Sequence, residues 1–383
     1  MSIVVQEIPL ALYVHWPWCV QKCPYCDFNS HQKRDADEAV YVQALIDDWA
    51  MQLPALSGRR ISSVFFGGGT PSLAHPRFIA AVLERVAKDA SLTVDCEITL
   101  EANPGTVDAA HFAGYRTAGV NRLSLGIQSF NSDLLQQIGR IHDGNQARQA
   151  IELARKLGFD NLNLDLMVGL PNQTEKTALS DIETALFFVP EHLSHYQLTL
   201  EPNTPFFARP PKNLPDEDLA DNLQMVCHDR LRAAGFNRYE VSAWQANRNS
   251  ASRHNLNYWQ FGDYIGIGAG AHGKLTLADG SIVRTNHAKS PVRYVQTISA
   301  TLLPKIEPLW AENLPFEFLM NALRLREGIN ASFFLQRTGL PLLAIEKQWQ
   351  QGVVDGFLEP ISDKLVTTNL GYYYLNSVLS HWL

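Results

Sequence analysis

Residues 19–26 read Cys19-Val-Gln-Lys-Cys23-Pro-Tyr-Cys26, and they closely follow a short apolar run at residues 10–15. Three of the five cysteines of this 383-residue chain fall in this one loop. Such clustering in a long chain indicates metal or redox chemistry rather than a disulfide framework. Three thiolates on a short loop can bind three irons of a [4Fe–4S] cube and leave the fourth iron without a protein ligand. A zinc site is the alternative, because His15 or His31 could supply a fourth ligand.

Outward from this loop, the sequence alternates strand and helix signals six times. Short apolar runs predict strands at residues 10–15, 61–66, 96–101, 122–128, 162–168 and 193–200. Helical spacing of apolar residues predicts helices at residues 35–53, 78–87, 107–118, 145–157, 174–188 and 216–234. The repeated order of strand, loop and helix predicts a parallel sheet with crossover helices. Because six units fall short of the eight in a closed barrel, the predicted fold class is α/β with a partial, open (β/α)6 barrel.

The pattern changes in the last third of the chain. Residues 237–300 mix short strands with the glycine-rich run 266–273, and a proline-rich hinge at 202–215 precedes them. Helical patterns near 315–325, 331–338 and 342–354 are followed by two short strand-like runs, which favours a small, mainly helical, winged-helix-like unit. We therefore predict three domains, with the barrel core at 1–235, a barrel extension at 236–305 and the C-terminal unit at 306–383.

Composition excludes several classes of protein. Hydrophobic residues make up 46% of the chain and charged residues 19%, which excludes a disordered, collagen-like or coiled-coil chain. The formal net charge of −7 argues against a nucleic-acid partner. No apolar run approaches the roughly 18 residues of a transmembrane helix. The first residues lack the basic start of a signal peptide, so we expect a cytoplasmic protein.

Polar and glycine residues follow the predicted strands at the end where barrel enzymes place their active sites. Gly67, Gly68 and Gly69 let the backbone approach a ligand closely, and their N–H and C=O groups could pair with it; a tight turn is the plainer reading. Glu101 ends the third strand and suits a hydroxyl or amino partner, unless it caps a helix. The polar residues Gln128 and Asp165 interrupt apolar runs, and a buried polar group must find a partner.

This pattern resembles the radical S-adenosylmethionine (SAM) superfamily, whose C-x3-C-x2-C motif follows the first strand of a partial barrel. In that superfamily the open iron binds the amino and carboxylate groups of SAM, and reduction of the cluster cleaves SAM to a 5′-deoxyadenosyl radical. Further motifs are similar to the coproporphyrinogen dehydrogenase-like branch of the superfamily. They are residues 13–19 (YVHWPWC), 67–72 (GGGTPS), 101–104 (EANP), 124–129 (SLGIQS), 138–140 (IGR) and 163–171 (NLDLMVGLP).

The resemblance implies roles for individual residues. It implies Cys19, Cys23 and Cys26 as ligands of the [4Fe–4S] cluster. It implies that SAM is bound by Tyr13, Tyr25, Gly68, Gly69, Thr70, Glu101, Gln128, Arg140 and Asp165. Arg140 carries the guanidinium fork that can bind a carboxylate with two hydrogen bonds, although on its own it reads as an ordinary surface arginine.

Two features distinguish members of this branch. Coproporphyrinogen dehydrogenases have a fourth cysteine two residues after the third, where this chain has Phe28. The run Cys26-Asp-Phe-Asn and the run His254-Asn-Leu-Asn-Tyr-Trp259 instead resemble the HemW group, whose H-N-x-x-Y-W motif is linked to haem binding. This resemblance implies a haem chaperone with His254 as iron ligand, since imidazole is a common axial ligand of haem. A structural His254 is the alternative, and His195, His272 and His287 compete with it as ligands.

The HemW resemblance also implies partners. They are haem itself and haem-accepting proteins such as respiratory enzymes. One of these acceptors is expected to be membrane-associated. Two other functions are weighed against this one: an oxygen-independent coproporphyrinogen III dehydrogenase, disfavoured by Phe28, and an RNA-modifying radical SAM enzyme, disfavoured by the acidic composition. We expect no coproporphyrinogen dehydrogenase activity. Cys96 and Cys227 stand alone in apolar runs and are expected to be inert core residues.

Overall fold

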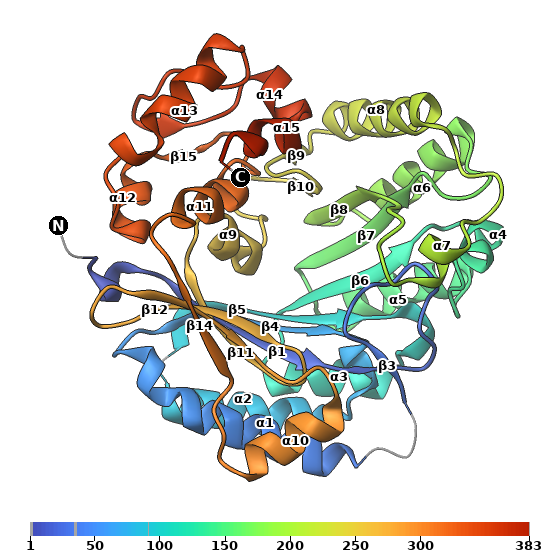
Figure 1. Ribbon diagram of the computed structural model, residues 1–383. Helices are drawn as coiled ribbons and strands as arrows, with labels where there is room; N and C mark the ends of the chain where they lie inside the picture. The colour runs from blue at the N-terminus through green and yellow to red at the C-terminus, as the bar shows by residue number, and fades with distance from the viewer. Residues whose placement is uncertain (1–2, 34–36, 91, 383) are drawn as a thin grey trace.

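A single curved sheet forms the centre of the computed structural model, which describes residues 3–33, 37–90 and 92–382 (Figure 1). Twelve strands of the described residues join this sheet in the order β14-β13-β12-β11-β1-β4-β5-β6-β7-β8-β10-β9. The middle of the sheet is parallel and consists of β1 (Leu10–Trp16), β4 (Ile61–Gly68), β5 (Leu92–Ala102), β6 (Arg122–Gln128), β7 (Leu162–Val168) and β8 (His192–Gln197). These strands confirm the predicted partial (β/α)6 barrel.

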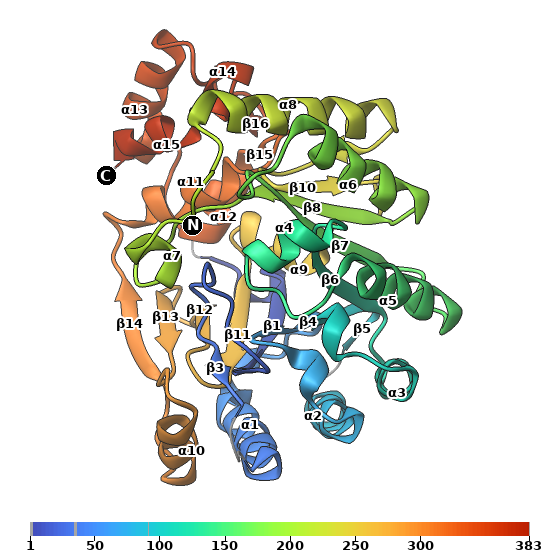
Figure 2. The ribbon, with the colours of Figure 1, turned by 90° about the vertical axis from the view of Figure 1, so that its right-hand side faces the viewer.

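The crossover helices cover the outer face of this sheet (Figure 2). They are α1 (Glu38–Gln52), α2 (Pro76–Asp89), α3 (Ala109–Ala118), α5 (Gly144–Lys156), α6 (Glu175–Phe187) and α8 (Glu217–Ala233). The short helices α4 (Ser132–Gln137) and α7 (Pro205–Ala208) lie in the loops after β6 and β8 instead, and Phe206 N–H of α7 donates to the Pro24 carbonyl of the cysteine loop at 3.0 Å. Helix α5 begins with a capping box between Asp143 and Gln146, a common helix start signal. Helix α1 is capped by Asp37, and residues 35–36, the start of the predicted helix, lie outside the described residues.

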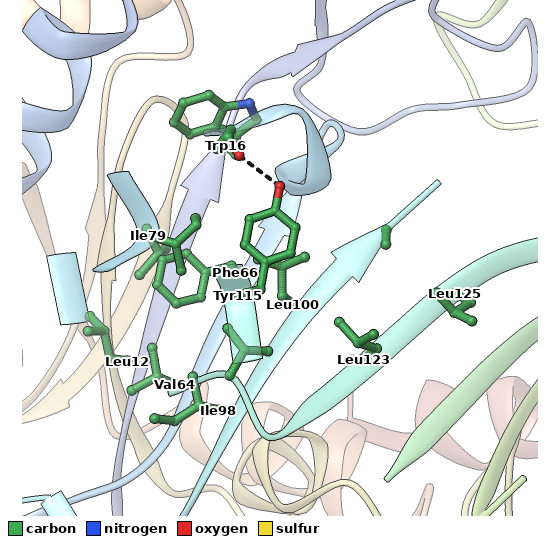
Figure 3. Packing of buried hydrophobic residues seen from close by; sticks show 14 of the residues in the cluster. Leu12, Trp16, Val64, Phe66, Ile79, Ile98, Leu100, Tyr115, Leu123 and Leu125 are labelled. Atoms are coloured by element: carbon green, nitrogen blue, oxygen red, sulfur yellow. Dashed lines mark hydrogen bonds between the residues drawn. The ribbon is translucent and has the colours of Figure 1, made fainter. Parts of the chain in front are cut away.

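The core lies between the sheet and these helices (Figure 3). Leu12 of β1, Val64 of β4 and Ile98 of β5 lie on the helix side of neighbouring strands and are nearly or fully buried. Residues that alternate with them, such as Tyr13, point toward the inside of the barrel. The apolar face thus packs against the helices, and the opposite face of the same strands is left for the site.

The sheet extends beyond the predicted barrel at both edges. One edge gains β11 (Asp263–Ile267), which is parallel to β1, and the antiparallel strands β12 (His272–Thr276), β13 (Ile282–Asn286) and β14 (Lys305–Leu309). The other edge gains β10 (Ala243–Gln245) and β9 (Asn237–Arg238). Helices α9 (Arg253–Trp259) and α10 (Pro291–Ser299) connect these strands. The cysteine loop lies between two short paired strands, β2 (Trp18–Cys19) and β3 (His31–Gln32).

The last part of the chain folds into a small helical unit with its own core. Its elements are α11 (Leu314–Ala322), β15 (Ile329–Asn330), α12 (Ser332–Thr338), α13 (Leu343–Val354), β16 (Lys364–Leu365), α14 (Asn369–Tyr373) and α15 (Leu375–Leu379). Strand β15 pairs with β16, and a further bridge joins Leu358 to Thr367. Helices combined with short antiparallel strand pairs are the arrangement of a winged helix. The core of this unit also takes in Phe261 and Ile282 of the extension, so a division at residue 306 stays a prediction.

None of the helices described between residues 3 and 382 is both long and apolar enough to cross a membrane.

Candidate functional site

A cavity of about 430 Å³ opens where the parallel strands end. Most of the residues singled out in the sequence line it together: Cys19, Cys23, Tyr25, Cys26, Gly68, Gly69, Thr70, Glu101, Gln128, Arg140 and Asp165. They come from the cysteine loop, from the ends of β4 to β7 and from the loop after α4. The fold thus gathers residues up to 146 positions apart at the carboxyl edge of the sheet, as expected for a barrel site.

The cysteine loop is fixed at its base by backbone hydrogen bonds. His31 N–H donates to the Pro17 carbonyl at 2.7 Å, and Lys33 N–H donates to the Cys19 carbonyl at 2.8 Å. The three thiols are half-buried, and burial raises the pKa of Cys19 and Cys26. Since the thiolate is the form that binds metal, a bound metal must supply the charge that ionises them.

The zinc alternative does not fit this loop. The His15 ring is fully engaged, with Nδ1 bonded to Tyr13 Oη at 3.0 Å and Nε2 to the Asn29 carbonyl at 2.9 Å. His31 Nε2 lies 3.3 Å from the Lys289 carbonyl. Among the described residues, no three His, Cys, Asp or Glu side chains converge as ligands of one ion. A cube offers a separate iron to each thiolate, so its cysteines need not converge, and the loop fits an iron–sulfur cluster.

The glycine run supports the cysteine loop. Gly69 N–H donates to the Trp16 carbonyl at 2.7 Å, and a Cβ at Gly69 would lie 2.7 Å from the Trp18 carbonyl oxygen. Gly68 has φ +112°, and a Cβ there would lie 2.5 Å from the His15 ring. The N–H groups of Gly68, Gly69 and Thr70 are all bonded within the protein, contrary to the expectation that such groups pair with a ligand. Glycine is required here because two backbone segments meet.

Two half-buried carboxyl groups face the cavity. Glu101 Oε2 accepts from Gly68 N–H at 3.1 Å, and burial followed by the nearby Asp165 raises the pKa of Glu101 to about 8. Asp165 accepts from Asn163 Nδ2 at 2.7 Å and from Ser124 Oγ at 3.1 Å, and burial raises its pKa as well. Two such groups close together in a cavity are suited to bind cationic or hydroxyl groups of a ligand.

Gln128 and Arg140 complete the polar wall. Gln128 has φ 67°, and its Oε1 accepts from Tyr196 Oη at 2.9 Å. Arg140 Nη2 donates to the Gly126 carbonyl at 2.7 Å, and Nη1 contacts Cys23 Sγ at 3.7 Å. Arg140 Nε is buried without a partner among the described residues. A buried donor of this kind is costly unless a ligand satisfies it, and a carboxylate would do so.

Ser124 and Tyr196 are among the polar residues of this wall to which the sequence analysis gave no role. Both lie in parallel strands, Ser124 in β6 and Tyr196 in β8. The available signal was a polar group within an otherwise buried strand, the same signal that identified Asp165.

A second cavity of about 640 Å³ adjoins the first and shares Asp27, Phe28, Gly68 and Glu101 with it. Tyr13 lines this second cavity rather than the first. The remaining wall consists of His15, Asn29, Tyr258, Trp259, Phe261, Gly262, Tyr264, Gly270, His272, Lys274, Arg284, Lys289, Met320 and Asn321. It therefore extends from the cysteine loop over β11 to β13 to helix α11.

His254 does not line either cavity. Its side chain is buried in α9, with Nδ1 bonded to Ser63 Oγ at 3.0 Å and Nε2 to Tyr258 Oη at 2.8 Å. Burial lowers the pKa of His254 to about 3. Both nitrogens are bonded within the protein, and His254 as an iron ligand stays a prediction beside the structural alternative. Arg253, the first residue of α9, pairs with Asp95.

Comparisons with known proteins agree with this architecture. The family model for the radical SAM superfamily matches residues 13–185, and the HemN C-terminal domain model matches residues 309–374. The chain is 46% identical over 381 residues to the heme chaperone HemW of Escherichia coli K12, covering 99% of this chain and all of that protein. It is 45% identical to the heme chaperone HemW of Haemophilus influenzae, with 98% of both chains covered.

Among solved structures, the chain resembles coproporphyrinogen III oxidase (HemN) from Escherichia coli, with a TM-score of 0.82 and 21% identity over 98% of this chain and 90% of that one. At this identity the likeness bears on the fold alone.

Proposed function

The chain belongs to the HemW family of the radical SAM superfamily, and on that basis we propose that it is a haem chaperone, which binds haem and passes it to an acceptor protein. The observation that carries the proposal is the second cavity, which has aromatic walls and adjoins the cavity of the cysteine loop. Flat aromatic surface with a few polar groups is what a porphyrin site needs. The name of its full-length relatives supports the same function.

Membership of the superfamily implies a [4Fe–4S] cluster and SAM. We assign the cluster to Cys19, Cys23 and Cys26, and the fit of the loop described above supports that assignment. When bound, the cluster would supply an electron for chemistry on SAM. Arg140 would bind the SAM carboxylate through Nε, which has no partner within the described part of the chain, and Glu101 would bind the amino group. Gln128 and Asp165 would bind the remaining polar groups of SAM.

SAM affinity should depend on pH through Glu101. With a pKa of about 8, Glu101 is mostly neutral at pH 7, whereas a cationic amino group binds its ionised form. Binding must therefore expel a proton, and SAM affinity should rise by up to about tenfold per unit from pH 6 to 8, then level off. Titration calorimetry in buffers of different ionisation enthalpy measures this proton release. In Glu101→Gln, SAM affinity should not change with pH and SAM binding should release no proton. If SAM affinity still rises with pH in that variant, the proton comes from another group.

A coproporphyrinogen III dehydrogenase is the second candidate function, favoured only by the shared fold. Phe28 stands where those enzymes have a fourth cysteine, lines both cavities and is 58% exposed. A phenyl ring cannot supply a thiol, so we expect no protoporphyrinogen from the cluster-loaded protein. Anaerobic turnover assays with coproporphyrinogen III measure this, with protoporphyrinogen followed by fluorescence after oxidation. Sustained formation of protoporphyrinogen would instead support a coproporphyrinogen III dehydrogenase.

Respiratory enzymes and a membrane-associated acceptor stay predictions, as do the absence of a nucleic-acid partner and the cytoplasmic location. The net charge of −7 supports the exclusion of nucleic acid.

Haem binding and release test the proposed function directly. Cluster-loaded protein is titrated with ferric haem under anaerobic conditions, and the complex is then mixed with apomyoglobin as a generic acceptor. We expect a stoichiometric Soret complex that loses its haem to the acceptor. Absence of any Soret complex would reject a haem chaperone.

A further inference from the structure

We propose that a third cavity, between the barrel and the C-terminal unit, binds a small molecule that carries phosphate groups, and that Arg238 and Arg326 hold those groups. The cavity has a volume of about 1150 Å³. Its walls come from β8, β9, β10 and α8, and from α14, α15 and the segment after α11 in the C-terminal unit (Figure 1). Tyr196, Gln197 and Thr199 line both this cavity and the first one, so an occupant would lie beside the proposed SAM site.

Positive charge predominates in the wall of this third cavity. The charged groups that line it are four arginines and two carboxylates: Arg232, Arg238, Arg324, Arg326, Asp221 and Glu327. Arg232 pairs with Asp229, and Arg324 pairs with Glu240 at 3.0 Å. Arg238 and Arg326, by contrast, form no ion pair with any residue that the structure describes, although two carboxylates line the same cavity. Their charges are therefore available to an anion.

Arg238 and Arg326 meet at one aromatic ring. The guanidinium carbon of Arg238 lies 5.2 Å from the centroid of the Tyr372 ring, and that of Arg326 lies 4.7 Å from the same centroid. Burial lowers the pKa of Arg238, and the positive charge of Arg326 acts in the same direction, whereas Tyr372 and Glu240 oppose it. Two like charges held together in a partly buried place are unfavourable unless an anion compensates them.

Bonds within the protein fix the two guanidinium groups and leave donors free. Arg238 Nε donates to the Val241 carbonyl at 3.1 Å, and Nη2 of the same residue donates to the same oxygen. Arg326 Nη2 donates to Asn369 Oδ1. Within the described ranges of the chain, Arg238 Nη1 and both Nη1 and Nε of Arg326 have no hydrogen-bond partner. Fixed guanidinium groups with free N–H donors are well suited to bind phosphate oxygens.

Charge and size favour a phosphate-bearing molecule over a single carboxylate. A phosphate ester carries a charge of about −1.5 to −2 at neutral pH and so matches two guanidinium groups, whereas one carboxylate matches a single group. The volume exceeds the usual range for ligand pockets, about 300–1,000 Å³, which leaves room for an organic part. Tyr373 and Tyr374 also line the cavity, and as exposed aromatic side chains they offer a surface to that part.

The two arginines belong to different parts of the fold. Arg238 is the last residue of β9, whereas Arg326 follows α11. Arg326 N–H donates to the Tyr239 carbonyl at 2.9 Å, and Tyr373 Oη of α14 donates to Asp221 of α8 at 2.7 Å, so the two parts already contact each other around the cavity. An anion bound by both arginines adds a further link between them. Because such a ligand binds only the folded chain, it should raise the thermal unfolding temperature.

The test is titration calorimetry of the full, cluster-loaded chain with inorganic pyrophosphate at about 0.15 M ionic strength, where screening suppresses loose surface binding. We expect saturable binding of one pyrophosphate per chain and a rise in the unfolding temperature. Arg238→Ala should lower pyrophosphate affinity at least tenfold. Arg326→Gln can keep the bond to Asn369 and should have the same effect. Arg230→Ala is the matched control, because Arg230 pairs with Glu183 outside the cavity, and it should behave as wild type.

Two further ligands decide the chemical class. Citrate and a hexaglutamate peptide, as carboxylate ligands, should bind at least tenfold more weakly than pyrophosphate. Equal or tighter binding of either would overturn the assignment to phosphate, and the peptide result would point to an acidic protein segment instead. Iron content and thermal unfolding, measured in the same samples, show that each variant is folded, and Arg326→Gln keeps the test decisive if Arg238→Ala folds poorly. Absence of saturable pyrophosphate binding in the wild type, or wild-type affinity in both arginine variants, would overturn the proposal.

Discussion

Replacing Cys19, Cys23 and Cys26 together by alanine will abolish the cluster, and iron will fall from about four atoms per chain to nearly none. The fold will persist, because the loop is closed by β2–β3 backbone pairing and not by the thiols. Iron and sulfide analysis after anaerobic reconstitution measures the loss. Circular dichroism and thermal unfolding verify the fold.

The two remaining cysteines provide the control. Cys96 in β5 and Cys227 in α8 are buried in the main core, and burial raises the pKa of each thiol to about 12. Alanine at both positions should leave the iron content unchanged and cost some stability through the loss of buried side-chain volume. Full iron in the triple variant, or loss of iron in this double variant, would move the cluster away from the loop.

The strands of the barrel could be predicted because they are buried on both faces. The predicted ranges 122–128 and 162–168 match β6 and β7, whose residues are nearly all buried. Strand β5 begins at Leu92 instead of 96, since its first four residues are only partly buried or exposed and alternate apolar with polar side chains instead of forming a continuous apolar run. Strand β8 ends at Gln197 instead of 200, and the residues that follow it, Leu198 and Thr199, line the cavity. Burial is thus visible in a sequence, whereas backbone pairing beyond the buried part is not.

The site was predicted unevenly for a related reason. Residue type and strand position identified Glu101 and Asp165, because a polar group in an apolar strand stands out, and clustering in one loop identified the cysteines. The role of His254 could not be read in this way, since its two hydrogen bonds reach Ser63, 191 positions away, and Tyr258. A motif indicates that a histidine matters, but only the tertiary contacts show whether its nitrogens remain available to a ligand.

Replacing Arg140 by alanine should weaken SAM binding by about 10- to 150-fold, the equivalent of one charged hydrogen bond of about 1.5–3 kcal/mol lost from a buried site. The reason is geometric, because Arg140 Nη2 donates to the Gly126 carbonyl while Nε has no hydrogen-bond partner among the residues that the structure describes. Arg140→Lys keeps the charge but not the fork, so it should recover only part of the affinity. Equilibrium dialysis of SAM against cluster-loaded protein measures each Kd.

The control for this substitution is Arg148→Ala on α5. Arg148 also donates to a backbone carbonyl, that of Gly144, and it lies over the Phe130 ring rather than in the cavity. It should therefore leave SAM affinity unchanged. Because Arg140 also contacts Cys23 Sγ, iron content must be measured in the same samples. An Arg140→Ala protein with full iron and wild-type SAM affinity would show that this guanidinium orders Gly126 and the cysteine loop and that the SAM carboxylate binds elsewhere. Lost affinity with full iron would separate SAM binding from cluster binding within one cavity.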